Sequence, residues 1–166
     1  MDLQLKGKNA VITAASKGIG KAIALRLAGE GVNVAICARG DAALRATEAE
    51  LGRTGVKVCA QVCDVGQAEA LERFLMQARQ TLGSVDLLVN NASGFGLSDD
   101  EDAWLASVNV DLMATVRATR IVTPWMEASG GASIVHIRSV AALEVFGAAA
   151  AYSATKLAII SHSKLM

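Results

Sequence analysis

Short apolar runs alternate with segments of helical spacing along this chain of 166 residues. The runs are rich in β-branched residues and predict five strands, at 9–14, 32–38, 56–62, 85–89 and 132–137. Helices are expected between them, including a long helical region through Trp104 and Val122 and a last helix from about Ala151. Because the strands are apolar throughout and alternate with helices, the pattern predicts an α/β fold, a doubly wound parallel sheet with Rossmann-type topology.

Residues 1–166 are expected to form a single domain, since their number suits one buried core. In an open parallel sheet the ligand crevice lies outside the carboxyl ends of the strands, where the winding reverses. Polar residues that directly follow the predicted strands are therefore the candidates for a functional site.

The charge balance bears on whether nucleic acid or a membrane could be a partner. Sixteen Lys and Arg residues balance sixteen Asp and Glu residues, so no overall field would gather nucleic acid or an anionic membrane. No apolar run reaches the roughly 18 residues that cross a bilayer, and Cys37, Cys59 and Cys63 lie in apolar runs without metal-ligand spacing. We therefore expect a cytoplasmic protein with reduced thiols, no nucleic-acid or membrane partner and no metal.

A glycine turn follows the first predicted strand. It consists of Thr13, Ala14, Ala15, Ser16, Lys17, Gly18, Ile19 and Gly20. Unpaired N–H groups and the helix dipole at such a turn bind anions, and glycines let a pyrophosphate approach the backbone closely. A strand-to-helix turn with two glycines is often only a turn, so this segment alone leaves cofactor binding open.

Two further strand ends carry polar residues. Asp64 and Val65 follow the third strand, where Asp64 would most simply be the N-cap of the next helix. The fourth strand closes with Asn90, Asn91, Ala92 and Ser93, and two consecutive Asn residues could merely form a turn.

Tyr152 and Lys156 are one helical turn apart, so both project from one face of the last helix. A free phenol has a pKa of about 10, but a cation within several ångströms favours the phenolate, which can exchange a proton with a substrate oxygen. Ser139, at the end of the fifth strand, has a hydroxyl suited to hold that oxygen while charge develops on it. Taken singly, each of these residues is more often structural than catalytic.

Together and in this order, these segments resemble the short-chain dehydrogenase/reductase family, in particular its NADP(H)-preferring, 3-oxoacyl-reductase-like members. The glycine turn is similar to the family's T-G-x-x-x-G-I-G with Ala14 in place of the first Gly, and residues 90–93 are similar to N-N-A-G with Ser93 in place of Gly. Arg138 stands where family members often have Ser. The resemblance implies an oxidoreductase that transfers a hydride between NADP(H) and a carbonyl or alcohol substrate, with Tyr152 as general acid/base.

The resemblance also implies residue roles. Asn109, Ser139, Tyr152 and Lys156 would be the catalytic set, with Asn109 anchoring a water in the proton relay and Lys156 holding the nicotinamide ribose. Asp64 would contact the adenine ring. The expected cofactor-binding residues are Thr13, Ala15, Ser16, Lys17, Gly18, Ile19, Gly20, Arg39, Asp64, Val65, Asn91, Ala92, Ser93, Tyr152 and Lys156.

The end of the second strand bears on the choice of nicotinamide cofactor. It carries no carboxylate that could bind a free ribose 2′-hydroxyl, whereas Arg39 could grip a 2′-phosphate and Lys17 could add a second positive charge. A lone basic residue is usually a solvated loop charge. Two of them at positions where the family's NADP(H) members carry basic residues favour NADP(H).

Family members extend beyond this sequence, and the last helix ends without a glycine or capping signal. We therefore expect a sheet truncated before its last strands and a missing C-terminal substrate lid. A 3-oxoacyl thioester, a steroid, a sugar and a small ketone remain open as substrates, with 94–96 and 143–148 expected to border the pocket. We expect a homodimer or homotetramer. The alternative is a catalytically impaired dinucleotide-binding or assembly fragment of such an enzyme.

Overall fold

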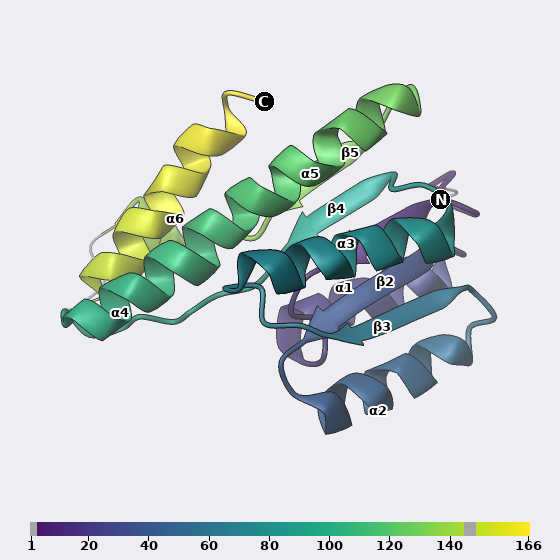
Figure 1. Ribbon diagram of the computed structural model, residues 1–166, viewed down its shortest axis with the longest axis horizontal. Helices are drawn as coiled ribbons and strands as arrows, with labels where there is room; N and C mark the ends of the chain where they lie inside the picture. Colours follow the sequence, from purple (N-terminus) through teal and green to yellow (C-terminus); the bar gives the residue numbers. More distant parts are fainter. Residues whose placement is uncertain (1–2, 145–148) are drawn as a thin grey trace.

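Five parallel strands form one sheet in the order β3-β2-β1-β4-β5 in the computed structural model of the chain (Figure 1). The structure describes residues 3–144 and 149–166, so part of the segment 143–148 lies outside the described residues. The strands are β1 (Asn9–Ile12), β2 (Asn33–Ala38), β3 (Val58–Val62), β4 (Leu87–Asn90) and β5 (Ser133–His136). The winding reverses between β1 and β4, which confirms the doubly wound parallel sheet.

Helices cover both faces of this sheet. They are α1 (Gly18–Gly29), α2 (Asp41–Gly52), α3 (Ala68–Leu82), α4 (Glu101–Ala106), the π-helix η1 (Ser107–Met113), α5 (Ala114–Ala128), the 3₁₀-helix η2 (Val140–Ala142) and α6 (Ala150–Ser163). Alternate residues of a strand point to opposite faces. Ala10 and Ile12 accordingly pack with α1 and α2, while Val11 packs with α3 and α5.

The long helical region expected through Trp104 and Val122 is present, but it is not α-helical throughout. It contains seven residues of π-helix, η1, between α4 and α5, and Pro124 lies inside α5. A π-helical insertion changes which residues face inward, and such insertions are frequent at functional sites. The expected long helical region is therefore present, with a π-helical segment inside it.

The fifth strand also departs from the expected pattern. Burial along β5 alternates, with Ser133 and Val135 exposed and Ile134 and His136 half-buried, because β5 lies at an edge of the described sheet. The interior strands β1, β2 and β4 are buried along most of their length, as expected for parallel strands covered on both faces.

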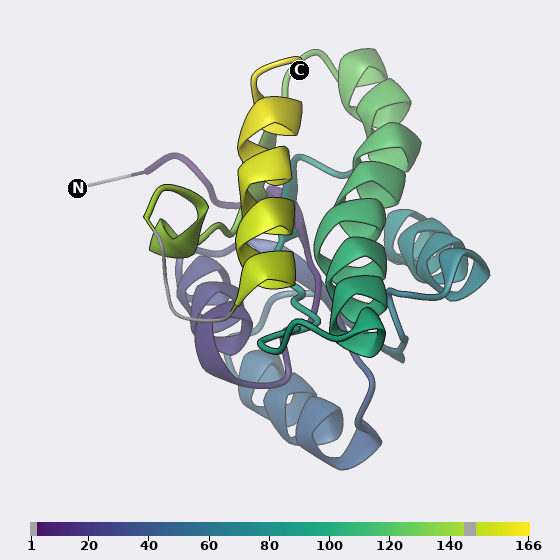
Figure 2. The ribbon, with the colours of Figure 1, turned by 90° about the vertical axis from the view of Figure 1, so that its left-hand side faces the viewer.

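Helix α6 lies beside the α4–η1–α5 helix in both views (Figures 1 and 2). It packs most closely on η1 and also contacts η2. This arrangement brings residues far apart in the sequence, from η1, from the end of β5 and from α6, into one region.

Candidate functional site

The glycine turn between β1 and α1 has the backbone geometry that its composition suggests. Ala14 has a φ of 53° and Gly18 a φ of 57°, both in the left-handed region that favours glycine. Ala14, where the resembled motif has Gly, thus adopts a glycine-like conformation in spite of its side chain. A side chain at Gly20 would lie 2.5 Å from Asn91 Nδ2 and 2.8 Å from the Ala14 carbonyl oxygen, so Gly20 permits close packing of α1 on the turn.

Hydrogen bonds join this turn to the end of β4. The Thr13 hydroxyl oxygen accepts from the backbone N–H groups of Asn91 and Ala92, at 3.0 and 3.2 Å. The Asn91 amide in turn donates to the carbonyl oxygens of Thr13 and Ala14, at 3.0 and 3.1 Å. Asn91 and Ala92 therefore hold the glycine turn in place. Their role goes beyond that of residues that merely form a turn after β4.

The start of α1 has the donor set that an anionic group requires. Lys17 and Ile19 are exposed, no side chain caps the helix, and its first turn contains no acidic residue. A side chain at Gly18 would meet nothing within 4 Å. The backbone of Ser16 is fixed by α2, because the Thr47 hydroxyl donates to the Ser16 carbonyl oxygen at 3.1 Å. The positive end of the helix is thus open, and a pyrophosphate fits it chemically.

The basic residues expected to select NADP(H) lie at neighbouring strand ends. Arg39 directly follows β2. Lys17 lies in the turn after β1, and β1 is hydrogen-bonded to β2. Both side chains are exposed, and within 3–144 and 149–166 neither forms an ion pair. By contrast, Arg45 on α2 is bound to Asp41 and Glu48. Lys17 and Arg39 are therefore available to an anionic ligand.

Asp64 does not cap α3, so the N-cap interpretation was wrong. The N-cap of α3 is Gln67, and the Asp64 carboxylate instead accepts from the Gly66 N–H at 3.0 Å. Val65 lies buried between them in the chain. This Asx turn fixes the chain after β3, with a carboxylate at the same end of the sheet as the glycine turn.

Asn109 is not brought to the other three expected catalytic residues. Its amide donates to the Gly66 carbonyl oxygen at 2.9 Å, and its own oxygen accepts from Arg117 at 2.9 Å. In η1 this side chain faces the Asp64–Gly66 turn rather than α6. It therefore supports the turn after β3.

Tyr152 and Lys156 share one face of α6, as their spacing predicts. The Lys156 ammonium lies 5.4 Å from the centre of the Tyr152 ring. It also donates to the carbonyl oxygen of Ile137, just after β5, at 3.3 Å. Ser139 follows two residues later, where its hydroxyl oxygen accepts from the Ala141 N–H at 3.2 Å and caps η2. Since η2 packs on α6, Ser139 belongs to the same region.

Sequence reasoning missed Asp111. This residue of η1 is fully buried, and its Oδ1 lies 2.9 Å from the Lys156 ammonium, which is 2% exposed. Its other oxygen, Oδ2, accepts from the Gly94 N–H at 2.9 Å. An isolated Asp in a helical pattern gave no signal, because its partner comes from a different helix.

Phe95, which was expected to border the pocket, lies next to Tyr152. Its ring stacks on that of Tyr152, with centroids 6.1 Å apart and planes at 10°. Phe95 has a φ of 50°, and a side chain at either Gly94 or Gly96 would collide with α4 carbonyl oxygens. The two glycines thus let this segment lie close against the helix and present the aromatic ring to Tyr152.

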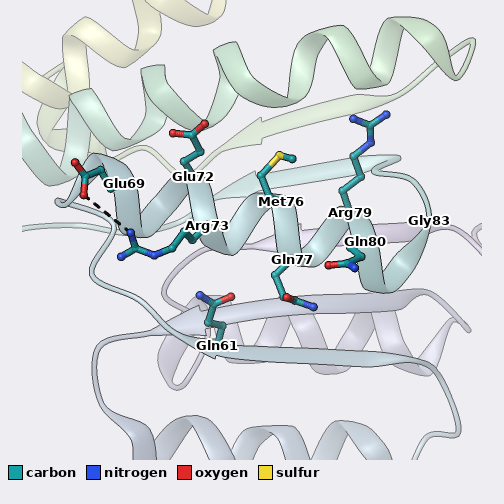
Figure 3. A pocket seen from close by; sticks show the side chains of 9 residues that line it. All are labelled: Gln61, Glu69, Glu72, Arg73, Met76, Gln77, Arg79, Gln80 and Gly83. Carbon is teal, nitrogen blue, oxygen red and sulfur yellow. Dashed lines mark ion pairs between the residues drawn. The ribbon is translucent and has the colours of Figure 1, made fainter.

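A shallow groove elsewhere does not belong to this region. Its lining residues lie mostly on α3, with Gln61 on β3, and most are charged or amide side chains, with Glu69 and Arg73 paired at 4.0 Å (Figure 3). It lies apart from the turn residues and from α6. No cluster of His, Cys, Asp and Glu among the described residues could hold a metal ion. No described helix has the length and apolar character needed to span a bilayer.

The cysteines and histidines lie outside the proposed chemistry. Cys37, Cys59 and Cys63 are free and buried, as expected, and the neighbouring Cys63 thiol together with burial raises the pKa of Cys37. Burial and, secondly, the nearby His162 lower the pKa of His136. The His136 Nδ1 atom lies 3.1 Å from the Asn90 amide nitrogen and accepts from it, which places the ring proton on Nε2.

The sequence matches known proteins over nearly its whole length. The model of the family described as short chain dehydrogenase matches residues 8–166. The pig protein named dehydrogenase/reductase SDR family member 4 is 37% identical over 165 residues, covering 96% of this chain and 59% of that protein. The chain thus spans about three fifths of this relative.

Solved structures agree with the described fold. L-sorbose reductase from Gluconobacter frateurii, complexed with NADPH and L-sorbose, superposes with a TM-score of 0.94 at 34% identity, covering 99% of this chain and 65% of that one. A xylitol dehydrogenase with bound NAD⁺ superposes with a TM-score of 0.93 at 29% identity, covering 98% of this chain and 64% of that one. Similar folds therefore carry either nicotinamide cofactor.

Proposed function

Because the chain belongs to the short-chain dehydrogenase family, we propose that residues 1–166 form the NADP(H)-binding and catalytic domain of an enzyme that interconverts a carbonyl and an alcohol. The observation that carries this proposal is the placement of Tyr152 and Lys156 on one face of α6, joined to the end of β5 by the Lys156 bond to Ile137. This placement puts the Tyr152 phenol and the Lys156 ammonium near the carboxyl end of the sheet, where ligands of doubly wound folds bind.

The cofactor would be held by the turn that β4 supports. We place its pyrophosphate on the open start of α1, around Ser16, Gly18 and Ile19, and its adenosine between the Asp64–Val65 turn and the segment from Asn91 to Ser93. The Gly66 N–H donates to Oδ1 of Asp64, so the other carboxylate oxygen, Oδ2, could accept from a donor on the adenosine. When bound, a nicotinamide would supply or accept the hydride.

The proton would pass through Tyr152. During reduction, the phenol O–H bond breaks and its proton goes to the substrate oxygen as the carbonyl carbon gains the hydride. The ammonium of Lys156, 5.4 Å from the ring, stabilises the resulting phenolate. The Ser139 hydroxyl would donate to the same substrate oxygen while negative charge develops on it. In the oxidative direction each transfer is reversed.

The preference for NADP(H) rests on Arg39 and Lys17, which are exposed and form no ion pair in the described part of the chain. Charge-assisted bonds to the 2′-phosphate give binding energy that NADH cannot obtain. Arg39→Ala should weaken NADPH binding by roughly 10- to 100-fold and leave NADH binding nearly unchanged. Arg53→Ala is the matched control, because Arg53 is exposed at the far end of α2.

Nicotinamide fluorescence titrations with NADPH and NADH test this proposal. Equal affinities of the unmodified chain for the two cofactors would end the case for Arg39 and Lys17. Tyr152→Phe tests the chemistry, since it should abolish carbonyl reduction and leave NADPH affinity within about twofold. Unchanged turnover in Tyr152→Phe would exclude Tyr152 as the proton donor.

We also propose that the chain assembles with copies of itself as a homodimer or homotetramer in the cytoplasm. Exposed apolar side chains on two adjacent helices, Trp104 and Leu105 of α4 and Leu157 of α6, support self-association. Sedimentation of the purified chain tests it, and a monomer at all concentrations would overturn it.

A further inference from the structure

The ion pair between Asp111 and Lys156 is an unusual feature of this site. Both side chains are almost fully buried, at 0% and 3% exposure, and the charged atoms are 2.9 Å apart. Removing two charges from water is costly, and replacement of such a pair by apolar residues is often neutral or stabilising. A buried pair beside an acid–base group therefore calls for an explanation other than stability.

Both oxygens of Asp111 face positive or donor groups. Oδ2 accepts from the Gly94 N–H, and Oδ1 contacts the Lys156 ammonium without the alignment of a hydrogen bond. An asparagine has one oxygen and one NH₂ group, so it could satisfy only one of these two neighbours. The geometry thus requires a carboxylate, not simply a polar side chain of this size.

The carboxylate acts on the same ammonium that faces Tyr152. The Lys156 nitrogen lies 2.9 Å from Asp111 Oδ1 and 5.4 Å from the centre of the phenol ring. A positive charge at that distance favours the phenolate, and a negative charge next to it offsets the effect. Because water is excluded from the pair, the offset is screened less than it would be at the surface.

We propose that Asp111 is a positioning residue that fixes the Lys156 ammonium beside Tyr152 and offsets the positive charge that faces the phenol. The proposal deepens the proposed function and rests on it for the role of Tyr152 as proton donor.

No other described charge replaces Asp111 in this role. On the elements packed against the pair, Glu101 and Asp102 of α4, Arg120 of α5, Arg138 after β5 and Glu144 after η2 are all exposed. Arg117 is engaged with Asn109 and the Gly66 carbonyl oxygen. His162, a further titratable residue of α6, lies against the ring of His136.

The chain offers a direct measurement, because Tyr152 is its single tyrosine. The near-ultraviolet absorbance of tyrosinate during a pH titration therefore reports the ionisation of this one phenol, without cofactor or substrate. Asp111→Asn should raise the ionisation constant of Tyr152 about tenfold, because it removes the offsetting negative charge. Asp111→Glu, which keeps the charge, should alter the constant by less than about threefold.

The outcomes separate the proposal from a merely structural role. An ionisation constant of Tyr152 that is unchanged or lower in folded Asp111→Asn would overturn it. If circular dichroism shows that Asp111→Asn is unfolded, Asp111→Ser is the second uncharged variant, since its smaller side chain leaves room for water at the ammonium. The ionisation constant of Tyr152 should rise in Asp111→Ser as well. If it does not rise, the proposal is overturned.

Failure of the proposed function would be recognised separately. A chain that binds neither NADPH nor NADH, or that reduces no carbonyl, contradicts the proposed function, yet the tyrosinate titration still measures the coupling between Asp111 and Tyr152. Conversely, active Asp111→Asn enzyme whose kcat falls with rising pH at the same midpoint as the unmodified enzyme would contradict the inference and leave the proposed function intact.

Discussion

The side-chain amide of Asn91 occupies the space that a side chain at Gly20 would need. The ideal Cβ position at Gly20 lies 2.5 Å from Asn91 Nδ2, and that nitrogen bonds to the carbonyl oxygens of Thr13 and Ala14. Helix α1 can therefore approach the end of β4 only because residue 20 has no side chain. The glycine serves packing between elements, while Gly18 leaves open space on the ligand side.

Gly20→Ala should destabilise the protein and disturb the turn. We expect the free energy of unfolding to fall by about 1–3 kcal/mol, because the added methyl must displace the Asn91 amide or the Ala14 carbonyl. Gly29→Ala, at the other end of the same helix, meets nothing within 4 Å and should be neutral or slightly stabilising. Urea denaturation of both variants makes the comparison, and equal effects would refute the packing argument.

Ala14→Gly should stabilise the chain. Alanine in the left-handed region costs roughly 1–2 kcal/mol, whereas glycine loses roughly 0.5–1 kcal/mol more backbone entropy on folding. With a φ of 53° at Ala14, the net gain should be about 0.5–1 kcal/mol. Thermal unfolding measures it, and a lower melting temperature would show that the Ala14 methyl makes a contact worth more than the strain.

Thr13→Val should loosen the link between β1 and β4. The hydroxyl of buried Thr13 accepts from the backbone N–H groups of half-buried Asn91 and Ala92, and an apolar isostere leaves both groups without this partner. We expect a loss of about 2–3 kcal/mol in the free energy of unfolding, together with weaker NADPH binding. Thr13→Ser retains the oxygen and should lose less than half as much. If the two variants behave alike, the methyl group rather than the hydroxyl matters at this position.

The pH dependence of stability should include a contribution from His136. Burial, and secondly His162, lower the pKa of this residue in the folded state, so the unfolded chain takes up the proton first as the pH falls. The free energy of unfolding should therefore decrease as the pH drops below the ordinary histidine value of about 6.5, and level off below the lowered folded-state pKa. Denaturant titrations of His136→Asn should show a smaller decrease over this window. An identical decrease in the variant would assign the effect to other groups.

The order of elements and the turn at the start of α1 could be predicted from the sequence because they depend on neighbours in the chain. Apolar runs bounded by glycine identify strands and turns locally, and parallel pairing then follows from the alternation with helices. The positions of Tyr152 and Lys156 are equally local, since one helical turn separates them.

The remaining features depend on contacts between distant segments. Asp111 could not be distinguished from a solvated helix residue until α6 placed Lys156 against it. Asn109 looked like a member of the catalytic set, but the π-helical spacing of η1 directs it to Gly66 and Arg117. Asp64 resembled an N-cap because nothing in the sequence shows that α3 begins only at Ala68, with Gln67 as its N-cap.

The π-helical segment Ser107–Met113 also bears on how the chain tolerates changes in length. A π-helical insertion accommodates one residue beyond the α-helical repeat, so one deletion within it could restore an ordinary α-helix. Such a deletion would rotate Asp111 relative to α5 by about 100°, the angle that one residue spans in an α-helix, and so turn it away from Lys156. A change of length in η1 would therefore alter which side chain of the long helix meets Lys156 on α6.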